Sequence, residues 1–378
     1  MDAMLEMPAI DKAKLGQVVL VFQGGGALGA YQAGVYQALH EAGVEPDWVI
    51  GTSIGAINAS LIAGNAPADR LPRLREFWRR MKHGLATQFA GAWGPGAANA
   101  MTVATGLPSF FRPNPFAFFG AQFPLGSEQA GYYSTEPLAE TLGELINPER
   151  LNSGAPRLTV GAASVQTGDM RYFDSREGEL GIRHVMASGA LPPAFPAIRI
   201  DGELYWDGGI LSNTPVEAVF DDIPRKSGLV FAVHVWSPNG PEPDSIGQVM
   251  SRQKDLQYSS RAASHIARQK QIHRLRHVIA ELAKRLPEDE RKRAEVKALT
   301  HYGCLTRMHV VRLLAPPLDG EDHAKDIDFS PAGISARWDA GYTETSRVLA
   351  QQPWTHQFDP VEGFILHEAA AGRMIREG

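Results

Sequence analysis

Ser53 stands between Gly51 and Gly55, after a short apolar run that ends at Ile50 and before a segment with helical apolar spacing. Gly-x-Ser-x-Gly between a strand and a helix is the nucleophile-elbow pattern. Such a serine is strained so that its hydroxyl is exposed, and the crowded turn requires neighbours without side chains. The next helix directs its first N–H groups toward a forming oxyanion. We therefore predict a nucleophilic Ser53; the alternative is a glycine-rich turn with an idle serine.

A second glycine cluster, Gly24, Gly25 and Gly26, follows the apolar run 17–22, which is typical of a strand buried on both faces. Its amides could bind a phosphate or an oxyanion. Together with Gly29 the cluster also has the glycine spacing of a dinucleotide site. That site needs an acid at the end of the next strand, where this chain has the serine elbow, so we do not favour it. A third alternative is a tight turn that serves only helix–strand packing.

The two motifs lie in a series of strand, glycine loop, helix, strand, elbow and helix between residues 17 and 62. This alternation predicts an α/β fold, with a mostly parallel sheet and helices on both faces. Residues 158–173 resemble two further strands around a turn at 167–169.

Three motifs in this order resemble the patatin-like phospholipase family: Gly24-Gly25-Gly26-x-x-Gly29, Gly51-Thr52-Ser53-Ile54-Gly55-Ala56 and Asp207-Gly208-Gly209. The runs 187–192 and 213–216 around the third motif are also similar to the family. The resemblance covers roughly residues 15–240 and implies a three-layer α/β/α fold. One departure is Leu28, because the family usually has Arg or Lys there. A lost cation could weaken catalysis or change the preferred head group.

The resemblance also implies the catalytic roles. Ser53 would be the nucleophile and Asp207 its general base, while Gly24, Gly25 and Gly26 would form the oxyanion hole. A buried carboxylate with few cations nearby has a raised pKa, which makes it a competent base near neutral pH. A tight turn at Gly208 and Gly209 would present Asp207 without shielding it, although Asp207 alone would read as an ordinary turn residue.

The implied activity is hydrolysis of carboxylic ester bonds of lipids through an acyl-Ser53 intermediate, with no metal or other cofactor. One alternative is a Ser-His-Asp esterase. His234 lies within an apolar strand pattern and His265, His273 and His277 in a helical segment, so only His184 and His323 stay open as partners. The other alternative is a non-catalytic lipid-binding protein whose activity was lost with the change at Leu28.

Composition limits the partners and the location. The net charge of −5 argues against a nucleic-acid partner. The single cysteine, Cys304, suits a reducing, cytoplasmic location, and residues 1–14 do not resemble a secretory signal. No apolar run approaches the roughly 20 residues of a membrane span, so we expect any lipid contact to be peripheral. The sequence does not indicate an oligomeric state.

Between the elbow and Asp207 the sequence predicts an exposed basic helix at 70–82 and a loop at 84–106. Six phenylalanines then fall between Phe110 and Phe123, interleaved with prolines that argue against a helix. The rings could form an acyl-pocket wall, a lid or a surface that enters lipid, or they could simply pack the core. Their spacing does not decide which way they face.

We divide the chain into an N-terminal tail (1–14), a catalytic domain (15–240) and a C-terminal extension (241–378). Residues 248–300 predict one or two long helices that pack through an apolar stripe. The stripe consists of Ile272, Leu275, Ile279, Leu282 and Leu286. Between Arg252 and Arg285 nine Lys or Arg face two acids, a net charge of +7 that leaves −12 on the rest of the chain. This asymmetry could attract an anionic membrane surface.

After these helices the extension predicts a strand at 307–314 and a helix at 331–350 with Ser330 as its N-cap. Residues 325–330, followed by Arg337 and Trp338, resemble the extension of one bacterial branch of the family.

Overall fold

A central mixed sheet runs through the computed structural model, which describes residues 10–84, 87, 91, 95–318, 321–359, 362–370 and 373–375. Its strands are β1 (Gln17–Phe22), β2 (Trp48–Thr52), β5 (Arg157–Ser164), β6 (Met170–Asp174), β7 (Ile198–Ile200), β8 (Glu203–Asp207), β9 (Gly228–His234), β10 (Met308–Leu314), β11 (Phe364–Ala370) and β12 (Arg373–Ile375). The order is β12-β11-β10-β9-β1-β2-β5-β8-β7, with β6 also paired to β5. From β11 to β5 the pairs are parallel.

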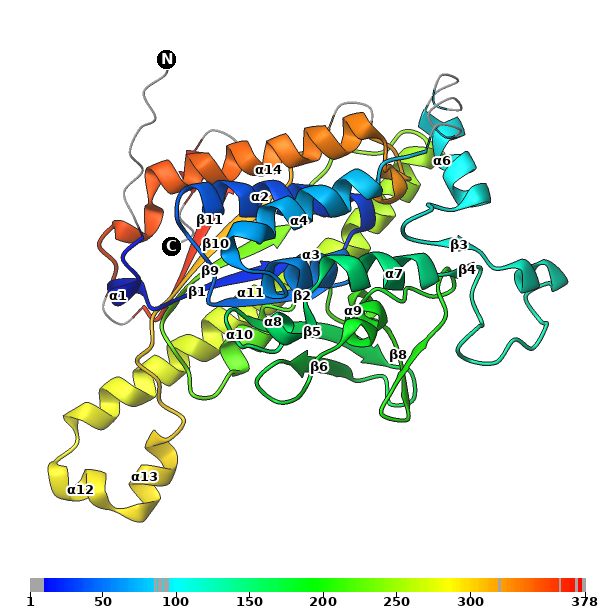
Figure 1. Cartoon of the computed structure of the whole chain (residues 1–378). Helices are drawn as coiled ribbons and strands as arrows, with labels where there is room; N and C mark the ends of the chain where they lie inside the picture. Colours follow the sequence, from blue (N-terminus) through cyan, green and yellow to red (C-terminus); the bar gives the residue numbers. More distant parts are fainter. Residues whose placement is uncertain are drawn as a thin grey trace.

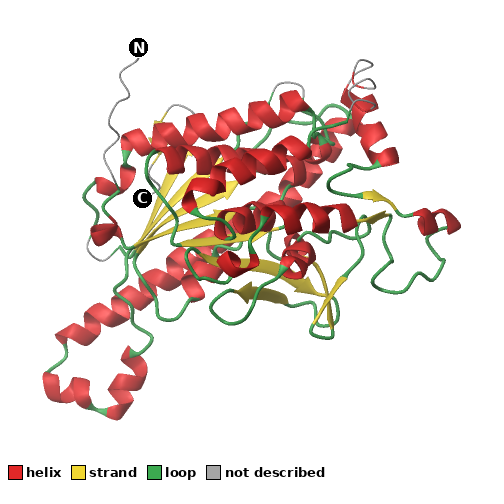
Figure 2. Ribbon diagram, in the orientation of Figure 1, coloured by secondary structure: helices red, strands yellow, loops and turns green. Residues whose placement is uncertain are grey.

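Helices cover both faces of this sheet, as Figures 1 and 2 show. The first face carries α2 (Ala30–Glu41), α3 (Ile54–Ala63), α4 (Pro67–Arg80) and α14 (Pro331–Gln351), and the second carries α10 (Glu217–Asp221) and α11 (Ile246–Arg285). Alternate residues of β1 supply the two cores, because successive strand side chains point to opposite faces. Val18, Leu20 and Phe22 join the first core, and Val19 and Val21 the second. The predicted α/β class with helices on both faces is confirmed.

Shorter elements fill the connections. They are α1 (Lys12–Leu15), α6 (Pro95–Thr105), α7 (Glu136–Leu145), α8 (Pro148–Leu151), α9 (Ile182–Ser188), α12 (Glu288–Lys292), α13 (Ala294–Thr300), and the 3-10 helices η1 (Gly26–Gly29), η2 (Pro115–Phe119), η3 (Gly208–Ile210), η4 (Lys325–Ile327) and η5 (Pro353–Thr355). A separate two-stranded ribbon pairs β3 (Arg112–Pro113) with β4 (Tyr133–Ser134). Among the residues that the structure describes, no helix is long and apolar enough to cross a bilayer.

Two expectations for the segment after α3 were wrong. The predicted loop at 84–106 contains α6, whose alanine-rich sequence favours a helix; residues 85, 86, 88–90 and 92–94 lie outside the described part. The basic helix α4 is amphipathic rather than exposed, since it buries Leu74, Phe77 and Trp78.

The C-terminal extension adds β10, β11 and β12 to the central sheet, whereas the sequence indicated one strand. Its helix α14 packs on α2, and the Ser330 hydroxyl accepts a bond from Gly333 N–H at 3.0 Å, as predicted for an N-cap. The division of the chain at residue 240 stays a prediction.

The predicted apolar stripe of α11 is largely wrong. Leu275, Leu282 and Leu286 are exposed, and the buried face carries Ile266, Gln269, His273 and His277 instead. The end of α11 extends with α12 and α13 beyond the sheet as a projecting arm, yellow at the lower left of Figure 1. Because the arm lies beyond the central sheet, the rest of the described chain does not cover the predicted stripe, and its leucines are exposed to solvent.

Candidate active site

Ser53 occupies the sharp turn between β2 and α3. Its backbone angles are φ 57° and ψ −128°, a conformation that side chains rarely adopt. A Cβ on Gly51 would lie 2.3 Å from the Gly55 carbonyl oxygen, and one on Gly55 would lie 2.4 Å from the Phe22 carbonyl oxygen. Both glycines are therefore required by close backbone contact. The turn is held from outside as well, because Ser53 N–H donates to the Ser188 hydroxyl at 3.0 Å.

Asp207 ends β8 and meets Ser53 across the sheet. Both residues line the same cavity, and the Asp207 carboxylate accepts a hydrogen bond from Gly209 N–H at 2.7 Å. The side chain is only 2% exposed. Burial raises the pKa of Asp207 to about 7, while the neighbouring Ser53 hydroxyl and the Gly209 N–H oppose part of that rise. A Cβ on Gly208 would lie 2.5 Å from the Gly161 carbonyl oxygen, so this turn also needs glycine.

The glycine loop lies beside Ser53, but its three amides are not equivalent. Gly24 N–H donates to the Asn213 carbonyl at 3.1 Å, which engages the first of the three predicted oxyanion donors. Gly25 and Gly26 line the same pocket as Ser53 and Asp207, and within the described residues we find no acceptor for their amides. Gly29 lies deeper, where a Cβ would come 2.6 Å from the Ile54 side chain. Gly29 therefore allows its helix to pack closely against Ile54 of α3 and does not line the pocket.

Three side chains that the sequence did not single out hold this loop. The Gly24 carbonyl accepts from Asn213 Nδ2 at 3.1 Å and from Trp236 Nε1 at 2.8 Å. Gln23 Nε2 donates to Thr214 Oγ1 at 2.7 Å, and its Oε1 accepts from Val235 N–H at 2.7 Å. The run containing Asn213 was a usable signal, whereas nothing in the sequence around Gln23 or Trp236 indicates these contacts.

A cavity of about 290 Å³ opens in front of the serine, and its walls are mostly apolar. Its aromatic lining consists of Phe110, Phe111, Tyr133, Phe195, Trp236, Tyr258 and Phe329. The phenylalanine-rich stretch is therefore divided: Phe110 and Phe111 form pocket wall, and Phe116, Phe118, Phe119 and Phe123 are exposed. Leu28 is buried in the core and is not among the lining residues.

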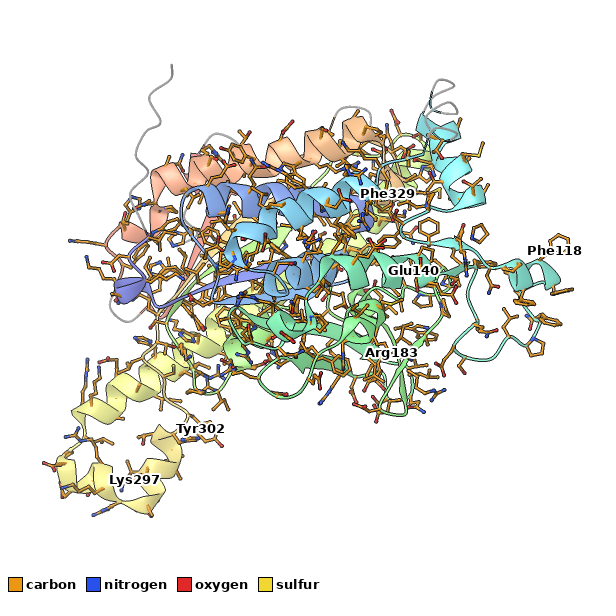
Figure 3. All side chains as sticks on the ribbon, viewed as in Figure 1. Phe118, Glu140, Arg183, Lys297, Tyr302 and Phe329 are labelled. Atoms are coloured by element: carbon orange, nitrogen blue, oxygen red, sulfur yellow. The ribbon has the colours of Figure 1, made fainter. Side chains whose placement is uncertain are left out.

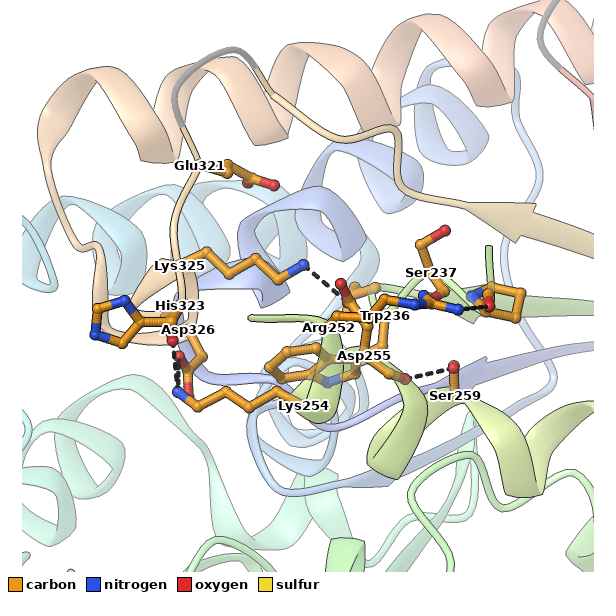
Figure 4. A network of polar contacts seen from close by, with 12 residues as sticks. Trp236, Ser237, Arg252, Lys254, Asp255, Ser259, Glu321, His323, Lys325 and Asp326 are labelled. Carbon is orange, nitrogen blue, oxygen red and sulfur yellow. Dashed lines mark hydrogen bonds and ion pairs between the residues drawn. The ribbon is translucent and has the colours of Figure 1, made fainter. Parts of the chain in front are cut away.

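The extension supplies part of the pocket wall through Asp326, Ile327 and Phe329. Figure 4 shows the polar contacts that hold this segment against α11. Lys254 pairs with Asp326 at 2.7 Å, and Lys325 pairs with Asp255 at 2.8 Å. A Cβ on Gly26 would lie 2.2 Å from the Asp326 carbonyl oxygen, so the segment presses directly on the glycine loop.

No histidine is found among the described residues that line this cavity. His234 is buried in β9, and burial lowers its pKa to about 3. His184 accepts from Gly181 N–H at 2.9 Å near Phe173, and His323 offers its carbonyl to Lys254. Neither histidine lies where it could take a proton from Ser53.

A strained serine, a buried carboxylate and the glycine loop therefore line one apolar pocket. The family model described as "Patatin-like phospholipase" matches residues 20–220, more than half of the chain. The chain belongs to the patatin-like phospholipase family, which confirms the resemblance and the three-layer fold. A second model, described as "Patatin phospholipase", matches residues 256–361 and so covers most of the extension.

Curated relatives are similar over the catalytic segment. "Lysophospholipase nte1" of Aspergillus terreus is 30% identical over 238 residues, which cover 62% of this chain and 13% of the relative. The protein of the same name from Neurospora crassa is 28% identical over 235 residues, with the same coverage. The chain thus spans about 13% of the length of these relatives. The solved structure of VipD from Legionella pneumophila aligns with 89% of this chain and 67% of that one at 16% identity, with a TM-score of 0.37.

Proposed function

We propose that this chain is a serine acyl hydrolase that cleaves carboxylic ester bonds of lipids, with phospholipids and lysophospholipids as the favoured substrates. The observation that carries the proposal is that the strained Ser53 and the buried Asp207 carboxylate line the same apolar cavity beside the glycine loop. Family membership and the lysophospholipase relatives support a lipid ester as the substrate.

In the first half-reaction Ser53 Oγ attacks the ester carbonyl while Asp207 takes the hydroxyl proton. The amides of Gly25 and Gly26 stabilise the negative oxygen of the tetrahedral intermediate. The intermediate collapses to acyl-Ser53, and Asp207 returns the proton to the leaving alcohol. Water then attacks the acyl group with Asp207 again as base, which releases the fatty acid and restores Ser53.

The walls of the cavity favour an acyl chain over a charged group. Within the described part of the chain, the lining contains no lysine or arginine, and its acids are Asp207 and Asp326. We infer that the acyl chain lies in the cavity and that the head group stays toward the opening, where discrimination between head groups is weak.

A fluorophosphonate probe tests the assignment, because it labels only an activated serine. We expect labelling of the parent chain and none of Ser53→Ala, with strong loss in Asp207→Asn. His184→Ala and His323→Ala serve as matched controls that keep the label. Loss of labelling in a histidine variant would favour the Ser-His-Asp alternative, and an unlabelled parent would favour the non-catalytic lipid-binding alternative.

We also propose that contact with membranes is peripheral, since a lipid hydrolase must reach substrate that resides in aggregates. The basic helix α11 is one candidate surface, through electrostatic attraction to anionic lipid. Binding that weakens with salt and with neutralisation of Arg268, Lys270, Arg274 and Arg276 would identify it. The fold also presents a second candidate membrane-binding surface, which is apolar rather than basic.

A further inference from the structure

An aromatic loop, residues 114–132, projects from the body next to the pocket. Its tip is η2, where Phe116 is 52%, Phe118 93% and Phe119 64% exposed. Figure 3 shows Phe118 at the outermost point of the molecule on that side. Phe123 is 45% exposed and packs on Phe119, with ring centroids 4.9 Å apart. Exposed rings gathered in this way are uncommon on soluble proteins and mark an interaction surface.

The tip is also free of charge. No residue between 113 and 127 is ionisable, and Glu128 at the returning side is paired with Arg199 at 2.7 Å. Electrostatic attraction to an anionic partner would contribute little binding free energy at such an uncharged surface. Transfer into an apolar medium would contribute more, because each phenylalanine ring removed from water adds free energy in proportion to its buried area.

The base of the loop is fixed to the pocket rim. Asn114 Nδ2 donates to the carbonyls of Gln129 at 3.0 Å and Gly131 at 2.9 Å, which closes the loop at its stem. Tyr133 N–H donates to the Ala194 carbonyl at 2.9 Å, and both residues line the catalytic cavity. The two ends of the aromatic loop are therefore continuous with the cavity wall.

We propose that the aromatic loop inserts into the acyl-chain region of a lipid surface and sets the cavity opening against it. This inference rests on the proposed lipid substrate, which resides in such a surface. The lipid can then move its chain from the bilayer into the cavity without crossing water. The arm with the basic end of α11 projects from the opposite side of the molecule, as Figure 1 shows, so the two surfaces are separable by mutation.

Vesicle flotation tests the loop independently of catalysis when Ser53→Ala is used as the parent. We expect this protein to float with uncharged phosphatidylcholine vesicles, with little effect of salt. Adding Phe116→Ser, Phe118→Ser and Phe119→Ser should reduce the bound fraction by roughly tenfold or more, as expected for the lost burial of three rings. A matched control replaces three exposed arm residues, Leu275→Ser, Leu282→Ser and Leu299→Ser, and should bind as the parent does.

Equal binding by the two triple variants would overturn the proposal, as would binding that needs anionic lipid and is lost only on neutralising α11. A parent that forms a dimer which the phenylalanine variant abolishes, with no vesicle binding, would assign the loop to a second copy and also overturn it. Phe118→Trp adds a direct measurement: brominated acyl chains should quench its fluorescence if the tip reaches the hydrocarbon.

Rates of hydrolysis on a soluble ester and on vesicles distinguish a failure of the docking surface from a failure of the proposed enzymatic function. With Ser53 restored, the phenylalanine variant should hydrolyse a short monomeric ester like the parent and phosphatidylcholine vesicles far more slowly. Parent protein that binds vesicles through the loop but hydrolyses neither substrate would contradict the enzymatic function and leave the docking surface supported. Equal loss on both substrates would contradict the docking surface.

Discussion

Ser53 holds a backbone conformation that costs a non-glycine residue roughly 1–3 kcal/mol, and its surroundings fix it there. Ser188 binds its amide, and the close approach of Gly51 to Gly55 leaves no room for the turn to relax. Asp207 is likewise kept in an unfavourable state, a carboxylate almost without solvent. Both conformational strain at Ser53 and burial of the Asp207 carboxylate lower the stability of the fold. The burial of Asp207 predicts two effects that can be measured.

The first consequence concerns rate against pH. The base must be ionised to accept the serine proton, so kcat/KM for a soluble ester should rise with pH and level off above about 7, the pKa of Asp207. Asp207→Asn should lower kcat by about a hundred- to ten-thousand-fold, the usual contribution of a general base, and the residual rate should lose this inflection. An inflection that survives in the variant would contradict the assignment.

The second consequence concerns stability. Below the ordinary pKa of 3.8, Asp207 is protonated in both the folded and the unfolded chain. As pH rises from there to about 7, the unfolded chain ionises first, so this group makes the folded state progressively less stable, and the penalty is constant above that pH. Asp207→Asn removes the penalty. The melting temperature of the variant should therefore exceed that of the parent by more at about pH 8 than at about pH 4; a pH-independent difference would contradict burial of the charge.

At the scale of elements, the site is built where β1, β2 and β8 end, and the extension covers it through η4. The two ion pairs of η4 differ in burial: Lys325–Asp255 is nearly buried, whereas the side chains of Lys254 and Asp326 are 33% and 24% exposed. Partly exposed pairs of the second kind contribute only about 0–1 kcal/mol to folding. Their importance should therefore appear in catalysis more than in stability, because η4 presses on the loop that carries the proposed oxyanion donors.

We expect Lys254→Met and Asp326→Asn each to lower kcat for long-chain esters with little change in melting temperature. The charge-swapped pair Lys254→Asp with Asp326→Lys should recover part of the loss. The exposed pair Lys292–Glu288 on the arm, 2.7 Å apart, is the matched control, and breaking it should leave kcat unchanged. If the two disruptions have the same effect, η4 does not support the site.

The sequence predicted the elements that local pattern determines. The apolar run of β1, the elbow at Ser53 and the cap at Ser330 depend on neighbours within a few residues, and all three lie as expected. The support of the glycine loop depends on Trp236, which lies 212 positions from Gly24 along the chain, and no local pattern records such a contact. The predicted burial of the α11 stripe is wrong because apolar periodicity identifies one face of a helix but not whether another element packs against that face.

At the scale of the whole molecule, the aromatic loop and the arm project from opposite sides of the body, as Phe118 and Tyr302 mark in Figure 3. The cavity opens beside the loop. The molecule thus has one end suited to an apolar surface and another where exposed leucines lie among side chains of both charges. Only the first end adjoins the proposed active site.

The arm should therefore be dispensable for hydrolysis. A Cβ on Gly303 would lie 3.1 Å from the Ala280 Cα, so residues 281–302 can be replaced by a short Gly-Ser turn that joins neighbouring points. We expect the shortened chain to fold and to hydrolyse phosphatidylcholine vesicles at the parent rate, measured by fatty acid release. A large loss on vesicles with normal hydrolysis of a soluble ester would show that the arm takes part in lipid binding.

A crystal structure of the chain after reaction with a phosphonate ester would test the roles of Ser53, Asp207 and the glycine loop together. We expect phosphorus bonded to Ser53 Oγ, the phosphonyl oxygen within hydrogen-bond distance of the Gly25 and Gly26 amides, and the Asp207 carboxylate beside the serine oxygen. An adduct on another residue, or an imidazole in the place of Asp207, would contradict these roles.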